Sequence, residues 1–112
     1  IFRFPGGSIN AYNRGIYQEL ISEMLRRGFL YYDWNVSCMD ANPSITPKEI
    51  VETIKSTVNG QDRLVILAHD STSKHQTVEA LPEIIEYIRE AGYTFERFDK
   101  FVEPVVFVYP TY

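Results

Sequence analysis

Apolar and polar residues recur along this chain in the pattern of strands followed by amphipathic helices. In residues 11–27 apolar side chains return at helical spacing and Gly28 follows as a stop signal, so this segment is predicted to be a helix. The sequence TPKE at residues 46–49 is a capping box with proline at the first helical position, which predicts the start of a second helix. A third helical pattern ends at Gly92, and Pro82 leaves its start undefined by several residues.

Each predicted helix has one apolar face that should pack against a sheet. Asn59 and Gly60 form the predicted stop of the second helix. The side chains expected to face the core are Ile16, Leu20, Ile21, Met24 and Leu25 in the first helix, Ile50, Ile54 and Val58 in the second, and Leu81, Ile84, Ile85 and Ile88 in the third.

Strand patterns precede these helices. Residues 1–4 are a short apolar segment, residues 29–37 are dense in aromatic side chains, and residues 63–68 are predicted to be a fully buried strand because five apolar residues follow one charge. Residues 94–98 and the apolar run between 104 and 110 predict two further short strands. Three successive strand–helix units indicate a parallel α/β sheet, and runs such as VILA indicate burial on both faces.

Composition narrows the class of protein. The 112 residues suit one small domain, and a hydrophobic content of 45% supports an ordinary core rather than disorder. The net charge of -4 comes without a basic stripe, which argues against a nucleic-acid surface, and no run reaches the roughly 18 apolar residues of a membrane span. Cys38 is the only cysteine, so an intrachain disulfide is excluded, and its strand-like context predicts a buried, unreactive thiol.

The start of the chain opens directly into apolar residues, as though a strand had been cut. It lacks the charged and apolar regions of a signal peptide. A sheet with a cut strand would leave one edge and some apolar surface unpaired, so we expect the isolated chain to self-associate.

Three predicted strand ends carry polar residues that are able to do chemistry. Ligands bind at the carboxyl ends of strands in parallel α/β folds, where FPGGS, SCMDA and HDSTSKH lie in this chain. His69 directly follows an apolar strand, so it either transfers a proton or only hydrogen-bonds a strand end. His69, Asp70 and His75 are a poor metal set, because two histidines on one loop have no fixed geometry, and His75 is expected to be a solvated loop residue.

The remaining polar and aromatic residues at these ends have structural as well as functional interpretations. Gly6 and Gly7, ahead of a predicted helix, could hold an anion with backbone N–H groups or form a plain turn. Ser8 has neither a G-x-S-x-G elbow nor an evident base, which argues against a serine hydrolase. Taken in isolation, Trp34 is expected to be a core aromatic residue and Asp40 a turn residue or helix cap.

Three motifs in chain order resemble those of the polysaccharide deacetylases, the NodB-homology or carbohydrate esterase family 4 type. FRFPGGS resembles the family's R-x-P-x-G motif, WNVSCMDA its tryptophan and aspartate spacing, and VILAHD its L-x-H motif. The segment TVEALPEIIEYIREAGYTF is similar to the family's final helix and strand, so the resemblance covers essentially the whole chain. The matching residues are Arg3, Pro5 and Gly7, then Trp34 and Asp40, then Leu67 and His69.

This resemblance implies roles for individual residues. His69 would be the general acid that protonates the leaving amine, oriented by Asp40, and Arg3 would hold the catalytic-base aspartate. The family's backbone oxyanion donor falls on Gly6, in place of the usual aromatic residue, so the N–H is kept while a side-chain contact is lost. The substrate-binding residues would be Gly6, Pro5, Trp34 and Leu67, the last two lining the pocket for the acetyl methyl group.

The resemblance also implies a fold and an activity. The fold class would be α/β with parallel strand–helix repeats, part of a distorted (β/α) barrel without its N-terminal strands. Residues 1–112 would be the C-terminal portion of a single catalytic domain that deacetylates an N-acetylglucosamine polymer, such as peptidoglycan or chitin, outside the cell or at its envelope. The family's T-F-D-D-G and H-[ST]-x-x-H motifs are absent, so zinc or another divalent metal is expected for the complete domain, with no ligand in this chain, and the isolated chain is expected to be inactive.

Two other functions remain open on the sequence. The missing metal motifs and the aromatic residues Tyr31, Tyr32 and Trp34 suit a non-catalytic carbohydrate-binding or inactive deacetylase-like module, because a sugar face stacks on a flat ring. Gly6 and Gly7 at a helix start would instead suit an unrelated α/β domain that binds anions.

Overall fold

The computed structural model describes residues 1–58 and 60–108 and divides into two compact units. The first unit combines Ile1–Trp34 with the chain from Arg97 onward, and the second is Asn35–Glu96. Each unit has its own core, so the two are described separately.

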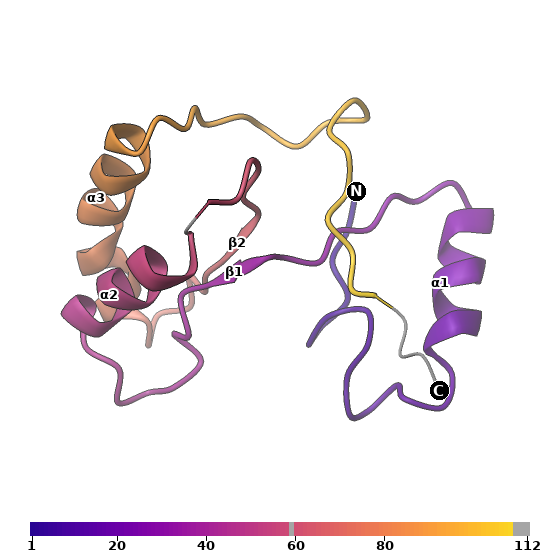
Figure 1. The fold of residues 1–112 in the computed structure, drawn as a ribbon. Helices are drawn as coiled ribbons and strands as arrows, with labels where there is room; N and C mark the ends of the chain where they lie inside the picture. The colour runs from indigo at the N-terminus through magenta and orange to yellow at the C-terminus, as the bar shows by residue number, and fades with distance from the viewer. Residues whose placement is uncertain (59, 109–112) are drawn as a thin grey trace. The chain divides into compact units, whose positions relative to one another are not determined.

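The second unit is a small α/β arrangement of two strands and two helices (Figure 1). Strands β1 (Val36–Ser37) and β2 (Ile66–Leu67) pair in parallel, with Val36 opposite Ile66. Helix α2 (Pro47–Thr57) packs against β1 and against helix α3 (His75–Glu90). The predicted α/β class with parallel strands is therefore confirmed. The buried core consists of Val36, Cys38, Ile45, Ile50, Val51, Ile54, Val58, Ala80, Ile84 and Ile88.

Helix α2 begins at the predicted capping box. The Thr46 side chain accepts a hydrogen bond from the Glu49 N–H at 3.1 Å, and the Glu49 carboxylate accepts one from the Thr46 N–H at 3.1 Å. This reciprocal pair satisfies two backbone groups that have no partner inside the helix. The predicted apolar face is confirmed, because Ile50, Ile54 and Val58 are all buried. Of the predicted stop, Gly60 has φ of 76°, while Asn59 lies outside the described residues.

Helix α3 begins well before Pro82, although proline is best tolerated in the first turn of a helix. Pro82 is its eighth residue and lies on the exposed side, where it has no N–H to give to the carbonyl of Val78. Solvent can satisfy that carbonyl, which is why the proline is tolerated there. The predicted face is confirmed at Ile84 and Ile88 but wrong at Leu81, which is 46% exposed.

The first unit contains helix α1 (Tyr17–Arg26), which begins six residues later than predicted. The reason is a polar turn before it: the side-chain Oδ1 of Asn10 accepts from the N–H groups of Tyr12 and Asn13, at 2.8 and 3.1 Å. Such side-chain bonds compete with helix formation. The buried face is consequently Tyr17 and Ile21, with Met24 partly buried, packed on Phe4. Ile16, Leu20 and Leu25, which the pattern placed in the core, are exposed.

The predicted strands are shorter than the apolar runs. Residues 1–4 and 29–37 contribute one parallel bridge, between Phe2 and Tyr31, in addition to β1. Within 63–68 only β2 is regular, and its residues are half-buried rather than fully buried. Residues 94–98 and 104–108 contain no strand, and the end of the last predicted strand lies outside the described residues. A strand needs a neighbour along its whole length, and these segments instead make scattered bonds, such as Asp33 N–H to the Val105 carbonyl at 2.7 Å.

Candidate active site

In the second unit, Asp40 and His69 are joined by two short hydrogen bonds. His69 Nδ1 lies 2.7 Å from Asp40 Oδ1, and the His69 backbone N–H donates to Asp40 Oδ2 at 2.7 Å. The Thr77 hydroxyl donates to the same Oδ2, also at 2.7 Å. The structure therefore brings together the two residues that the sequence assigned to proton transfer.

Backbone geometry at the two strand ends produces this pair. His69 comes two residues after β2, so it leaves the carboxyl end of the strand as expected. Asp40 follows Met39, whose φ of 55° lies in the left-handed region that few non-glycine residues adopt. That sharp turn after β1 directs the Asp40 side chain inward, while Met39 itself is 57% exposed. Strained backbone next to a polar cluster is typical of functional sites.

The electrostatics fix the proton on the histidine ring. Burial raises the pKa of Asp40, but hydrogen bonds from the His69 ring, the His69 N–H and the Thr77 hydroxyl outweigh it, so the pKa is lowered overall. Asp40 is therefore a carboxylate at neutral pH and can only accept hydrogen bonds. Consequently His69 Nδ1 carries a proton and Nε2 is the nitrogen left for a substrate. The His69 side chain is 36% exposed and Asp40 only 2%, so the histidine is the accessible member.

Cys38, directly after β1, and Leu67, in β2, lie close to this pair in the sequence. The Cys38 N–H donates to the Leu67 carbonyl at 3.0 Å. Burial, and secondarily the charge of Asp40, raise the pKa of the Cys38 thiol to about 11. The prediction of a buried cysteine is confirmed, and a protonated thiol is a poor nucleophile. Leu67 is half-buried and is the last residue of β2.

In the first unit, the FRFPGGS segment forms a loop around Trp34. The Arg3 guanidinium lies 5.9 Å from the centre of the Trp34 ring, and Trp34 packs edge-to-face on Phe107 with ring centres 4.9 Å apart. Arg3 makes one long hydrogen bond, 3.4 Å to the Phe4 carbonyl, and no ion pair with another described residue. Trp34 is thus half-buried in a small aromatic cluster rather than in a deep core.

Glycines shape the same loop. Gly6 and Gly7 have φ of 76° and 90°, a region that side chains disfavour. A Cβ on Gly7 would lie 2.4 Å from Cε2 of Phe107 and 3.0 Å from Cη2 of Trp34, so the aromatic rings require a glycine there. Both alternatives for these glycines, an anion site or a plain turn, assumed that a helix starts directly after them, but α1 begins ten residues after Gly7, at Tyr17. Pro5 and Gly6 are exposed at the tip of the loop.

A buried carboxylate holds this loop in place. Asp33 accepts from the Ser8 N–H at 2.8 Å, from the Ser8 hydroxyl at 2.5 Å and from the Phe107 N–H at 2.8 Å. The Asn10 amide donates to the Pro5 and Gly7 carbonyls at 3.2 and 2.9 Å. Ser8 is therefore a buried structural residue, in agreement with the argument against a serine hydrolase.

The proposed sugar-stacking patch is not present as a platform. Tyr32 is buried, packs on Phe98 with ring centres 4.5 Å apart, and donates to the Val102 carbonyl at 2.6 Å. Tyr31 packs on Phe4 instead, with ring centres 5.6 Å apart. Neighbouring strand-like residues point to opposite sides, so Tyr31, Tyr32 and Trp34 do not offer one flat surface.

Metal-ligating side chains do not converge in the described residues. No three His, Cys, Asp or Glu side chains of residues 1–58 and 60–108 lie close enough to hold an ion, including His69, Asp70 and His75. His75 is exposed as expected, but it is the first residue of α3 rather than a loop residue. No helix in the described part of the chain is long and apolar enough to span a membrane.

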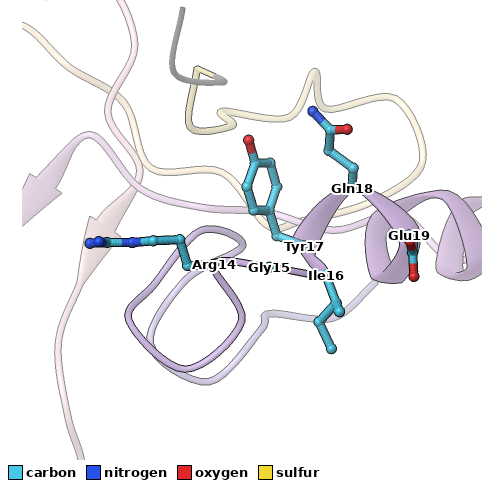
Figure 2. Close-up of a pocket in the computed structure, with 6 residues that line it drawn as sticks. All are labelled: Arg14, Gly15, Ile16, Tyr17, Gln18 and Glu19. Atoms are coloured by element: carbon cyan, nitrogen blue, oxygen red, sulfur yellow. The ribbon is translucent and has the colours of Figure 1, made fainter. Parts of the chain in front are cut away.

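A hollow beside the start of α1 does not coincide with any predicted site residue. Figure 2 shows the Arg14, Ile16 and Tyr17 side chains pointing in different directions from the turn, so no polar groups converge there. The residues that line the hollow are Arg14, Gly15, Ile16, Tyr17, Gln18 and Glu19.

Two residues that hold the candidate site residues in place, Asp33 and Thr77, were not predicted from the sequence. Asp33 was a lone charge inside the aromatic run FLYYDWNVS, and an acid among the apolar side chains of a predicted strand is a signal that it has a partner. Thr77 lies three and seven residues before Ala80 and Ile84, so it is a polar member of the buried face of α3. In both cases the signal was a polar residue at an apolar position.

Comparison with known proteins finds similar proteins among deacetylases. No family model matches the chain. It is 33% identical over 94 residues to a bifunctional xylanase/deacetylase of Pseudobutyrivibrio xylanivorans, covering 84% of this chain and 14% of that protein. The structure superposes with a TM-score of 0.86 and 36% identity on the catalytic domain of peptidoglycan N-acetylglucosamine deacetylase from Eubacterium rectale, covering 95% of this chain and 50% of that one.

A second solved structure supports the same assignment. A carbohydrate esterase family 4 (CE4) esterase of Streptococcus mutans gives a TM-score of 0.67 at 28% identity over 83% of this chain and 41% of that one. The chain thus spans about half the length of the solved relatives. In sequence and in fold, the chain is similar to part of the polysaccharide deacetylases of carbohydrate esterase family 4.

Proposed function

We propose that this chain provides the proton-donating part of an N-deacetylase that removes acetyl groups from an N-acetylglucosamine polymer such as peptidoglycan or chitin, at the cell envelope or outside the cell. The observation that carries the proposal is the Asp40–His69 pair, with 2.7 Å between Oδ1 and Nδ1 and the carboxylate fully buried. A buried acid behind an accessible histidine orients the ring and leaves one nitrogen for chemistry.

His69 acts as the general acid in this proposal. Hydrolysis of the acetamide adds a hydroxyl to the carbonyl carbon, and the C–N bond then breaks as the nitrogen receives a proton. His69 Nε2–H supplies that proton to the leaving amine, and the electron pair of the broken bond stays on the nitrogen. The Asp40 carboxylate balances the positive charge of the protonated ring, which is why the donor set around Asp40 has to keep it ionised.

The first unit supplies binding and positioning groups. The Gly6 N–H donates to no other described residue and is assigned to the developing oxyanion. Arg3, which makes no ion pair among the described residues, is assigned to hold the carboxylate that acts as base. Pro5 and Trp34 are assigned to substrate binding, as is Leu67 of the second unit.

The proposal includes zinc or another divalent metal, bound only in the complete domain. The described residues do not supply a set of ligands, so they do not fit the metal by themselves. We therefore assign the ligands to sequence outside this chain, which would be the C-terminal portion of one catalytic domain, and we expect no turnover from the isolated 112 residues.

The test is acetate release from acetylated chito-oligosaccharides with zinc present. The isolated chain is compared with the chain extended by its natural upstream sequence, and the expected result is activity only in the extended protein. In the extended protein, His69→Ala should lower kcat by about 10² to 10⁴-fold while bound zinc, measured by elemental analysis, stays unchanged.

The matched control is His75→Ala, which removes an exposed histidine of the same segment and should leave kcat unchanged. Retained turnover in His69→Ala would remove His69 from the mechanism. Absence of activity in both proteins would favour an inactive or carbohydrate-binding module, and activity in the isolated chain would place the active site elsewhere.

A further inference from the structure

Helix α3 reaches the Asp40–His69 pair through a residue in its first turn. Thr77 is the third residue of α3 and is buried, and its hydroxyl donates to Asp40 Oδ2 at 2.7 Å. A threonine inside a helix usually turns its hydroxyl to a carbonyl of the preceding turn. Here the hydroxyl bonds a carboxylate that lies 37 positions earlier in the chain.

Thr77 lies on the buried face of α3, where a polar side chain is unusual. The other buried residues of α3 are Ala80, Ile84 and Ile88, so Thr77 is the polar member of an otherwise apolar face. Packing alone would accept valine, which has the same shape and no hydroxyl to satisfy. The hydroxyl therefore has a purpose beyond filling space.

The Asp40 carboxylate is held by hydrogen bonds from His69 and from Thr77. Asp40 Oδ1 faces the His69 ring, and Oδ2 receives the His69 N–H and the Thr77 hydroxyl. The titratable groups against Asp40 are His69, after β2, and Cys38, at the end of β1. The His69 bonds come from one residue, so they move together if that turn moves. Thr77 is the only donor to Asp40 from another element among the described residues, and it ties the carboxylate to α3.

We infer that Thr77 is a positioning residue, which holds the Asp40 carboxylate in the orientation that presents Oδ1 to the His69 ring. This inference rests on the proposed function for its catalytic consequence, although the anchoring itself is a property of the second unit. Thr77 is buried and bonds Asp40, so we expect its loss to change the proton-transfer step and not substrate affinity.

The experiment compares Thr77→Val, which keeps the shape and removes the hydroxyl, with Thr77→Ser, which keeps the hydroxyl. The matched control is Thr57→Val, at an exposed threonine of α2 whose hydroxyl donates to the Thr53 and Ile54 carbonyls. Two quantities are measured: the titration of the Asp40 carboxyl by carbon NMR in this chain, and kcat and KM for acetate release in the extended protein. The carboxyl titration needs no turnover.

In Thr77→Val the Asp40 titration should move to higher pH, and kcat should fall about 10-fold with KM unchanged, a factor typical of one lost hydrogen bond to a charge. Thr77→Ser should restore both, and Thr57→Val should change neither. An unmoved Asp40 titration in Thr77→Val, or equal losses in the valine and serine variants, would overturn the anchoring role. If instead His69→Ala stays active while the Asp40 titration moves as expected, the proposed function fails and the anchor stands.

Discussion

Gly7→Ala tests how the FRFPGGS loop is packed against its aromatic neighbours. An alanine at φ of 90° carries a backbone penalty of about 1–2 kcal/mol, because its Cβ approaches the following carbonyl. Its Cβ would also lie 2.4 Å from the ring of Phe107 and 3.0 Å from that of Trp34, so at least one ring has to move. Overpacking of this kind costs about 1–3 kcal/mol. The free energy of unfolding should therefore fall by about 2–5 kcal/mol, a large part of the roughly 5–15 kcal/mol of a small domain.

Two glycines of the same unit separate these contributions. Gly28 has φ of 85° but open space around it, so Gly28→Ala should show only the backbone penalty. Gly15 has open space and no positive φ, so Gly15→Ala should raise stability by about 0.4–1 kcal/mol through the unfolded chain. The difference between Gly7→Ala and Gly28→Ala measures the steric contribution alone.

Urea unfolding followed by tryptophan fluorescence suits this series, because Trp34 is the only tryptophan and lies in the affected cluster. The extrapolated free energies of unfolding are compared at equal m-values. If Gly7→Ala is no more destabilising than Gly28→Ala, the Trp34 and Phe107 rings do not pack on Gly7 and the account of this loop is wrong.

Three further predictions concern the second unit. Thr46→Ala removes the capping hydroxyl of α2 and should lower the free energy of unfolding by about 1 kcal/mol, measured by circular dichroism in urea; no change would mean that the capping box contributes nothing. Because the pKa of Asp40 is lower in the folded than in the unfolded state, its stabilising contribution is complete above the ordinary aspartate pKa of about 3.9 and is lost as pH falls through the lower folded value. The stability difference between wild type and Asp40→Asn should therefore shrink as the pH falls below the ordinary aspartate pKa of about 3.9, and a constant difference would contradict the lowered pKa. Cys38, buried and with its pKa raised to about 11, should react with a thiol reagent at pH 8 only after urea is added, and rapid reaction of the native protein would show that the thiol is accessible.

Some features of the fold and the site could be predicted because the contacts that decide them are close in sequence. The capping box places the start of α2 within one turn, since both hydrogen bonds join Thr46 and Glu49. The strand-end position of His69 and the order of the motifs likewise needed only local pattern and resemblance. The same reasoning failed at α1, where the apolar period predicted the helix but the Asn10 bonds to Tyr12 and Asn13 delayed its start.

The amino-acid sequence by itself determined the α/β class, the capped helix α2, the buried cysteine and the residues that resemble a deacetylase site. Only the tertiary structure decided that Asp33 binds Ser8 and Phe107, that Thr77 binds Asp40, and that Tyr31 and Tyr32 turn to different partners. The hydrogen-bonded partners lie 25 to 74 positions apart in the chain. The partners of Tyr31 and Tyr32 are decided by the side of the backbone from which each side chain leaves. Local propensity acts over a few residues, whereas a buried polar group takes whichever donor the folded chain brings within 3 Å, and that is known only once the chain has folded.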